Sequence, residues 1–184
     1  MRSNQLQSGY SLLELMVALA MVMVLTTMAV PAVTTAISDA QLRSAAGGLA
    51  GTLQKARMIS ASADRAYALR LSGSSTVYID LNGNSTLDAS EMVNLLRLPR
   101  GVVIDASAPA LNAGFGTSVL GLPGFDPRGL PCAVSSGTCT FNQGTGFVVY
   151  LRQDRPFGAT SWAAVSVSPA GRIKTWMWSG TAWQ

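Results

Sequence analysis

The first group of residues whose spacing suggests chemistry is an acidic string in the middle of the chain. Oxygen-bearing side chains stand at the first, third, fifth, seventh, ninth and twelfth places of residues 80–91, which is the spacing of an EF-hand calcium loop. Ser85 occupies the sixth place, where a glycine normally makes the turn. A hairpin tip rich in Asn, Asp, Gly and Ser forms the same string without metal. A calcium site and a metal-free hairpin are therefore both open, and the ligands of that site would be Asp80, Asn82, Asn84, Asp88 and Glu91.

A second group of residues is basic and aromatic and lies near the C-terminus. In a strand over 171–178 alternate side chains share a face, and Arg152 and Arg155 are candidates to lie nearby. Basic groups neutralise phosphates and aromatic rings stack on bases, so DNA is a candidate partner. The alternative is a solvated strand face, and the net charge of +4 permits an anionic partner without requiring one. The residues on the shared face would be Arg172, Lys174, Trp176 and Trp178.

The remaining composition argues against an enzyme. The chain has no histidine, which excludes a Ser-His-Asp or Cys-His nucleophile and any His-ligated zinc or iron site. Two cysteines are too few for a four-thiolate metal site, and the spacing of Cys132 and Cys139 is not the C-x-x-C of redox enzymes. We therefore expect no catalytic residues and, calcium apart, no cofactor.

The element at the N-terminus is a long apolar segment. The 24 residues from Leu15 to Ser38 carry no charge and would span about 36 Å as a helix, enough to cross a hydrocarbon core of about 30 Å. The small residue Gly9 precedes this segment, whereas an ordinary secretory signal is cut after its apolar core. Glu14 stands at its start, where the positive end of the helix dipole favours a carboxylate but the membrane boundary makes an unpaired one costly.

The string Gly9-Tyr10-Ser11-Leu12-Leu13-Glu14 resembles the type IV prepilin processing site, commonly G-F-T-L-L-E. The resemblance implies cleavage after Gly9 by prepilin peptidase and methylation of the new amine on Tyr10. It also implies that Glu14 neutralises an N-terminal amine within a filament of pilins, so that the helix is an assembly interface rather than a passive anchor. Pro31 lies where pilin-like helices carry a proline, which bends or locally melts the helix.

After the membrane segment the pattern changes twice. Apolar residues at three- and four-residue steps from Leu42 to Ile59 predict that the helix continues to about residue 63 with one buried stripe. Short β patterns follow, separated by turn residues. The stretch 106–136, rich in Gly, Pro and Ala, is expected to be a long surface excursion. The strands are predicted near 66–71, 75–81, 92–98, 101–105, 137–142, 146–152, 162–168 and 171–178.

Three strings in the head resemble minor pilins and pseudopilins of the GspH/FimT class. They are Tyr78–Asn84 with Asp88 and Glu91, then Phe125–Gly129, then Ser168–Arg172. The resemblance implies a β-sandwich-like head on a long helix and a low-abundance subunit. The string Gly171-Arg172-Ile173-Lys174 also resembles the G-R-x-R motif of pilins that bind DNA, with Lys174 in place of the second arginine.

These observations predict an α+β fold, in which a long, partly transmembrane N-terminal helix packs on a small antiparallel β-rich head. The predicted divisions are a leader (1–9), a transmembrane and assembly half-helix (10–38), an amphipathic half-helix (39–64) and the head (65–184). The head would lie in the periplasm on a single-pass protein of the bacterial inner membrane. In such a compartment Cys132 and Cys139 are expected to form a structural disulfide.

The predicted function is that of a minor pilin, which prepilin peptidase processes and which joins or primes a type IV pilus. Its partners would be other pilins and the inner membrane. Two alternatives stay open: a DNA receptor pilin used in natural transformation, and a minor pseudopilin of a type II secretion system, whose filament partners are pseudopilins.

Overall fold

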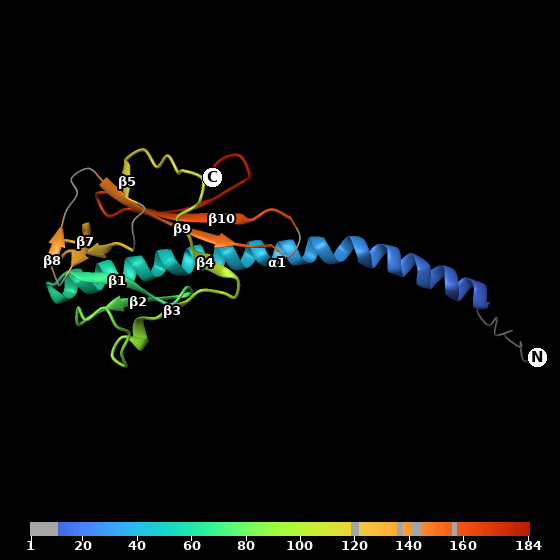
Figure 1. Cartoon of the computed structure of the whole chain (residues 1–184), viewed down its shortest axis with the longest axis horizontal. Helices are drawn as coiled ribbons and strands as arrows, with labels where there is room; N and C mark the ends of the chain where they lie inside the picture. The colour runs from blue at the N-terminus through green and yellow to red at the C-terminus, as the bar shows by residue number, and fades with distance from the viewer. Residues whose placement is uncertain (1–10, 119–121, 136–137, 141–144, 156–157) are drawn as a thin grey trace, which may run out of the picture.

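The structure is a computed structural model that describes residues 11–118, 122–135, 138–140, 145–155 and 158–184 (Figure 1). One long helix comes first in the chain, and short strands follow. The elements are α1 (Leu12–Ala63), β1 (Tyr67–Ser72), β2 (Thr76–Asp80), the 3-10 helix η1 (Met92–Asn94), β3 (Leu96–Arg97), β4 (Val102–Ile104), β5 (Gly116–Ser118), β6 (Gly124–Phe125), β7 (Pro131–Ser135), β8 (Thr138–Thr140), β9 (Thr145–Gln153), β10 (Ser161–Val167) and β11 (Ile173–Met177).

Both ends of α1 are capped by side chains or backbone groups that its sequence supplies. The Ser11 hydroxyl oxygen accepts the Glu14 N–H at 3.2 Å, and a serine followed three residues later by a glutamate is the pattern of a capping box. At the other end Asp64 adopts a left-handed conformation with φ 51°, and its N–H donates to the Ser60 carbonyl. The start and the end of the helix are therefore both encoded locally.

Between these caps α1 runs for 52 residues and passes through Pro31 as one element. Helix melting at this proline, one of its two expected effects, does not occur. The hydroxyl groups of Thr34 and Thr35 donate to carbonyl oxygens one turn earlier, including that of Pro31 itself. At 1.5 Å per residue the helix is about 78 Å long, so its N-terminal half projects from the head.

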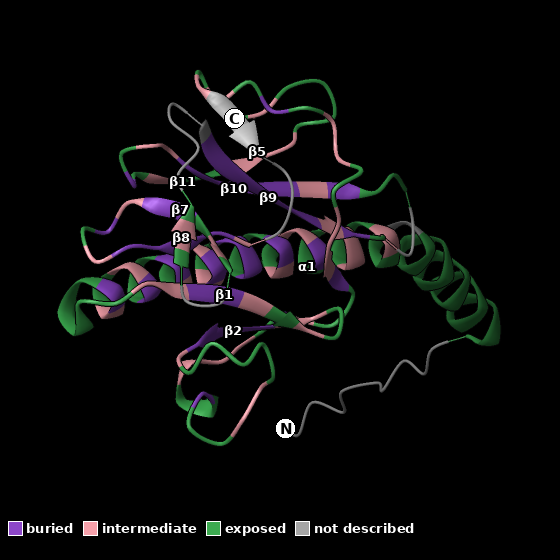
Figure 2. Cartoon of the chain, turned by 60° about the vertical axis from the view of Figure 1, so that its left-hand side comes forward, coloured by how far each residue is buried: buried purple, intermediate pink, exposed green. Residues whose placement is uncertain are grey.

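The C-terminal half of α1 lies between two sheets, and Figure 2 shows one sheet on each side of it. The predicted apolar stripe is confirmed. Its residues belong to one core cluster with apolar side chains of β1, β2 and β6 from one sheet and of β9 and β10 from the other. The helix residues at the centre of this core are 0–2% exposed: Leu42, Ala45, Ala46, Leu49, Leu53 and Ala56.

The two sheets account for all the strands. One has the order β3-β2-β1-β6-β7-β8, and the other has the order β11-β10-β9-β4, with β5 added beside β9. The β5–β9 pair is parallel, and the other pairs are antiparallel. The predicted α+β arrangement, a long helix on an antiparallel β-rich head, is confirmed.

The strand predicted over residues 92–98 is wrong for its first half. The Glu91 N–H donates to the Asp88 carbonyl and the Asn94 N–H to the Glu91 carbonyl. Each bond joins residues three apart, so the chain makes two successive tight turns instead of an extended strand. Only Leu96–Arg97 then pairs with β2. The apolar residues that suggested a strand are on the surface, since Met92 is 63% exposed and Val93 is 81% exposed.

The expectation that residues 106–136 form a surface excursion is also wrong. Three strands, β5, β6 and β7, lie within it. Phe125 and Cys132 are fully buried, and the Leu111 N–H donates to the Tyr150 hydroxyl at 3.0 Å. These strands are only two to five residues long, and their partners are distant in sequence, so they leave little periodic pattern.

Gly124 offers a test of this corrected region. A Cβ placed there would lie 2.6 Å from the Tyr67 carbonyl oxygen and would overlap the Val134 side chain. Gly124→Ala is expected to lower the free energy of unfolding by about 1–3 kcal/mol, the usual cost of overpacking. Urea unfolding of the whole chain in detergent micelles measures the change.

Gly47→Ala is the matched control, because Gly47 lies within α1 and a Cβ there meets nothing within 4 Å. Alanine in that position should raise stability by about 0.5–1 kcal/mol. Equal effects of the two substitutions would contradict the packing of β6 described above.

Candidate functional site

The first candidate site is the N-terminal half of α1, which is long and apolar enough to cross a membrane. None of its most apolar stretch is covered by the rest of the chain. Exposed apolar surface of this extent indicates a lipid or protein contact. The large apolar residues that are at least 47% exposed are Leu12, Leu13, Leu15, Met16, Val17, Leu19, Met21, Val22, Met23, Val24, Leu25, Val30, Val33 and Ile37.

Glu14 is the single acidic residue in the first turn of this helix. Its own backbone N–H is bound by the Ser11 hydroxyl, and its exposed side chain lies near the positive end of the helix dipole. The predicted processing residues, Gly9 and Tyr10, lie outside the described residues. Glu14 is therefore the described polar group best placed to meet an amine from another chain.

A second candidate site forms where two of the head motifs meet the end of α1. A Cβ on Gly171 would lie 2.7 Å from the Gly129 carbonyl oxygen, so the loops 125–129 and 168–172 are in contact. Arg57 of α1 lies against both loops, and its Nη1 donates to the Gly171 carbonyl at 3.1 Å. Gly129 and Gly171 have φ of 75° and 79°, which side chains other than glycine rarely adopt. The Arg57 side chain thus joins two strings that are distant in sequence.

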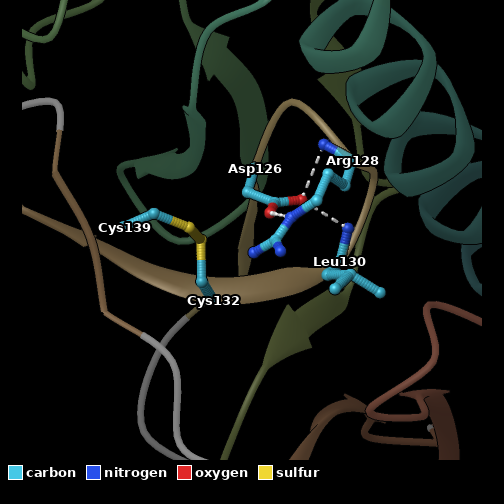
Figure 3. The surroundings of a disulfide bond; sticks show 5 residues. All are labelled: Asp126, Arg128, Leu130, Cys132 and Cys139. Atoms are coloured by element: carbon cyan, nitrogen blue, oxygen red, sulfur yellow. Dashed lines mark hydrogen bonds and ion pairs between the residues drawn. A yellow bond between two sulfur atoms is a disulfide. The ribbon is translucent and has the colours of Figure 1, made fainter.

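Asp126 fixes the conformation of the first of these loops (Figure 3). One of its carboxylate oxygens accepts the Arg128 N–H at 3.0 Å and the Leu130 N–H at 2.7 Å, and the other accepts Arg128 Nε at 2.8 Å. The Asp126 residue is 2% exposed, whereas the Arg128 side chain is 71% exposed. The loop therefore presents an arginine to solvent from a rigid turn.

The disulfide lies one strand beyond this loop, also in Figure 3. Cys132 of β7 and Cys139 of β8 are bonded, with their Cα atoms 5.6 Å apart. The predicted pairing is confirmed. The bond joins two adjacent strands of one hairpin and supplies no reactive thiol.

The basic and aromatic residues of β11 are partly used in packing. Lys174 Nζ lies 3.4 Å from the centre of the Trp176 ring, a cation–π contact. The Trp176 Nε1–H donates to the Ser166 hydroxyl at 2.8 Å, and the ring packs on a cluster that includes Tyr150. Trp178 packs on Trp183, with ring centres 5.3 Å apart. Arg172, in the turn before the strand, is exposed.

The structure does not bring all six residues predicted to contact DNA together. Arg152 pairs across the sheet with Trp162, and Lys174 with Ser166, so they are about 13 Å apart along β10. Arg152 Nη1 is 2.6 Å from Asp105, and the Ser107 hydroxyl, with a smaller effect from Arg152, keeps the pKa of Asp105 below its usual value.

Arg155 is likewise bound elsewhere, because its Nη2 is 2.6 Å from Asp39 of α1. Arg128, by contrast, was missed from the predicted set. It lies next to the loop of Arg172, and the Phe125–Gly129 motif was the signal that could have included it.

The third candidate site, the acidic string, is a long loop after β2 that is held by its own carboxylates. Glu91 is fully buried and accepts the Leu81 N–H at 2.8 Å, and Asp80 accepts the N–H groups of Gly83 and Ser85 at 2.7 and 3.1 Å. The residues nearer the tip make further turns of the same kind, with Asn82 Nδ2 donating to Asp88.

The Ser90 hydroxyl is the main cause of a pKa of Asp88 below its usual value. Within the ranges that the structure describes, no three Asp, Glu, His or Cys side chains gather as metal ligands. A calcium site that also uses Asn82 and Asn84 stays a prediction.

Comparison with known proteins identifies one segment. Residues 4–30 match the family model described as the prokaryotic N-terminal methylation motif. No curated protein and no solved structure is similar to the chain. The match supports a type IV pilin-like protein that prepilin peptidase processes, and the confirmed long helix with its β-rich head agrees with that assignment.

Glu91→Ala tests the part that the buried carboxylate plays in the loop after β2. The substitution would leave the Leu81 N–H without its partner in a part-buried site and would empty the space of a fully buried side chain, so it should lower the free energy of unfolding by about 2–4 kcal/mol. Urea unfolding of the whole chain measures the loss. Asn84→Ala removes an exposed acceptor of the Thr86 N–H, which water replaces, and should cost less than about 1 kcal/mol. Similar losses in both variants would contradict the assigned part of Glu91.

Proposed function

We propose that the chain is a minor type IV pilin. Prepilin peptidase removes the leader after Gly9, the N-terminal half of α1 holds the subunit in the inner membrane with its head in the periplasm, and the same half-helix joins or primes a pilus. The observation that carries the proposal is the uncovered apolar half of α1 with the methylation motif at its start. Type IV pilin-like families consist of structural subunits, and we assign no catalysis to this chain.

The N-terminal half of α1 supports this function because it carries one carboxylate, Glu14, in an otherwise apolar surface. In a bundle of such helices Glu14 would be costly unless a positive charge lay beside it. The methylated amine of Tyr10, on a neighbouring subunit or its own, is the partner of matching charge. The large apolar residues Leu13 and Leu15 on either side of Glu14 are more than 60% exposed, so they are free to pack on other helices.

The firm attachment of the head to α1 supports a subunit that moves as one body. Asp39 binds Arg155 near the start of the packed half-helix, and Arg57 binds the Gly171 carbonyl near its end. A pseudopilin of a type II secretion system would use the same processing and the same helix. Co-purification with pilus or with secretion subunits separates these two assignments.

A DNA receptor pilin is the second candidate, favoured by the contact between the two loops at the end of α1. This contact puts the exposed Arg172 beside the loop that presents Arg128. Lys174 follows two residues later on an exposed part of β11. Phosphates would be bound there without sequence preference, since no described base-reading groove accompanies these cations.

Processing and assembly give the test of the main proposal. The mature protein is expected to begin with methylated Tyr10 by mass spectrometry, and Gly9→Val should block cleavage. Glu14→Val should permit cleavage but lower incorporation into sheared filaments about tenfold or more, because an unpaired charge in an apolar bundle costs on the order of 2–3 kcal/mol. Immunoblotting of the filament fraction measures incorporation.

Glu14→Asp is the control, since it keeps the charge and should retain part of the incorporation. A mature chain that begins beyond residue 30 would end the pilin assignment. Full incorporation of Glu14→Val would remove the part given to the carboxylate.

DNA binding by the whole chain in detergent should weaken steeply with salt. Each phosphate contact contributes about 0.7–0.9 to the log–log salt slope, so Arg128→Ala with Arg172→Ala should lower that slope by about 1.4–1.8. Arg152→Ala, which removes an ion-paired arginine from the far part of the sheet, is the matched control and should leave the slope nearly unchanged. Absence of a gel shift at low salt and high micromolar protein would exclude the receptor function.

A further inference from the structure

The end of the head nearest the apolar half of α1 contains a small polar cavity. Its volume is about 230 Å³, and it lies between α1, the start of β10 and the C-terminal segment. In Figure 1 the end of β9 lies over α1 at the end of the head that faces the projecting half-helix. The lining residues that matter here are Asp39, Arg43, Arg155, Ser161, Trp162 and Trp178.

The side chains that line this cavity carry more guanidinium groups than carboxylates. Arg155 Nη2 lies 2.6 Å from an Asp39 oxygen, which also accepts the Ser161 hydroxyl at 3.3 Å. Arg43, one helical turn after Asp39, is exposed and forms no ion pair within the described ranges. Two guanidinium groups thus face one side-chain carboxylate. Gln184 also lines the cavity, and its backbone oxygen accepts the Met177 N–H at 2.9 Å.

One donor in the cavity has no acceptor. Arg155 Nε is buried and unpartnered among the residues that the structure describes. A buried N–H that belongs to a charged group costs free energy unless an oxygen accepts from it. An anionic oxygen entering the cavity would meet the exposed guanidinium of Arg43, and a shift of the Arg155 side chain would bring its Nε–H to the same oxygen.

The position of the cavity along α1 identifies the source of such an oxygen. Leu15–Ser38 is uncharged and about 36 Å long, so its end lies a few ångströms beyond a hydrocarbon core of about 30 Å. Asp39 and Arg43 come directly after it, at the depth of lipid headgroups, and an arginine side chain reaches back toward the membrane. Trp162 and Trp178 add the amphipathic rings that are enriched at this depth.

We infer that the cavity binds the phosphate of an anionic phospholipid in the periplasmic leaflet of the membrane. Arg43 and Arg155 would contact the phosphate, while Trp162 and Trp178 would lie against the glycerol. The inference rests on the membrane insertion proposed above. Such a lipid would hold the head down on the membrane until the subunit leaves for the filament.

The test uses the whole mature chain in nanodiscs of equimolar phosphatidylglycerol and phosphatidylcholine. After transfer to a mild detergent, native mass spectrometry counts the lipids that remain bound. Phosphatidylglycerol should be retained about fivefold over phosphatidylcholine, the ratio that corresponds to about 1 kcal/mol for one arginine at an anionic surface. Arg43→Gln should bring the ratio close to one. Its exposed side chain has no partner among the described residues, so the fold should be kept.

Arg100→Gln is the matched control. Arg100 is exposed and lies in the turn before β4, whose first residue pairs with Gln153, so it is at the same end of the head but does not line the cavity. This variant should keep the preference for phosphatidylglycerol. Equal retention of the two lipids by the wild type, or an unchanged ratio in Arg43→Gln, would overturn the inference.

Co-flotation with vesicles of phosphatidylcholine alone tests membrane insertion separately from the anionic lipid site. A chain that floats with these vesicles but shows no lipid preference inserts in membranes without the proposed site, which overturns the inference alone. A chain that floats with neither neutral nor anionic vesicles overturns membrane insertion and the lipid site together.

Discussion

The structure depends on α1 filling the space between the two sheets. Leu42, Leu49 and Leu53 are fully buried there, and each contributes about 1.5–3 kcal/mol by its burial. Neither sheet has a complete core without these side chains, since the residues of β1 and β2 and those of β9 and β10 meet on the helix. Head and half-helix are therefore one folding unit. The projecting half of the same helix has no such partner within the chain, which makes its contacts with lipid or with other helices a necessity.

Arg57 gives the two glycine-containing head motifs a structural explanation. It lies under Gly129 and Gly171, where any Cβ would overlap the guanidinium or the neighbouring loop. The glycines of the two motifs are therefore explained by the packing of both loops on Arg57 of α1. The exposed Arg128 and Arg172 stand next to these glycines in the same two loops. The same residues can serve the fold and present charge, because the glycine and the arginine of each loop face different surroundings.

Much of the fold could be predicted because its patterns are local. The helix, its caps and its stripe follow from residues within one or two turns of each other, and β1, β2, β9, β10 and β11 follow from short runs of β-forming residues between turn residues. The turn at Glu91 could not be predicted from neighbouring residues. It depends on the hydrogen bond from the Leu81 N–H, ten residues away, to the Glu91 carboxylate, whereas the apolar residues after Glu91 favoured a strand. The ion pairs of Arg152 with Asp105 and of Arg155 with Asp39 were not predicted for a similar reason, since these partners are distant in sequence.

The order of elements along the chain has a consequence for how the protein reaches this state. The buried stripe of α1 is synthesised first, and the strands that cover it on one side, β9 and β10, are synthesised near the end. Contacts between segments so distant in sequence form slowly during folding. Until β9 and β10 have been made, the leucines of the α1 stripe stay exposed on that side. The disulfide joins residues only seven positions apart, so it leaves this closure unassisted. A chain interrupted before β9 would keep a fully formed helix with half of its core open, which is the form most prone to associate with other chains.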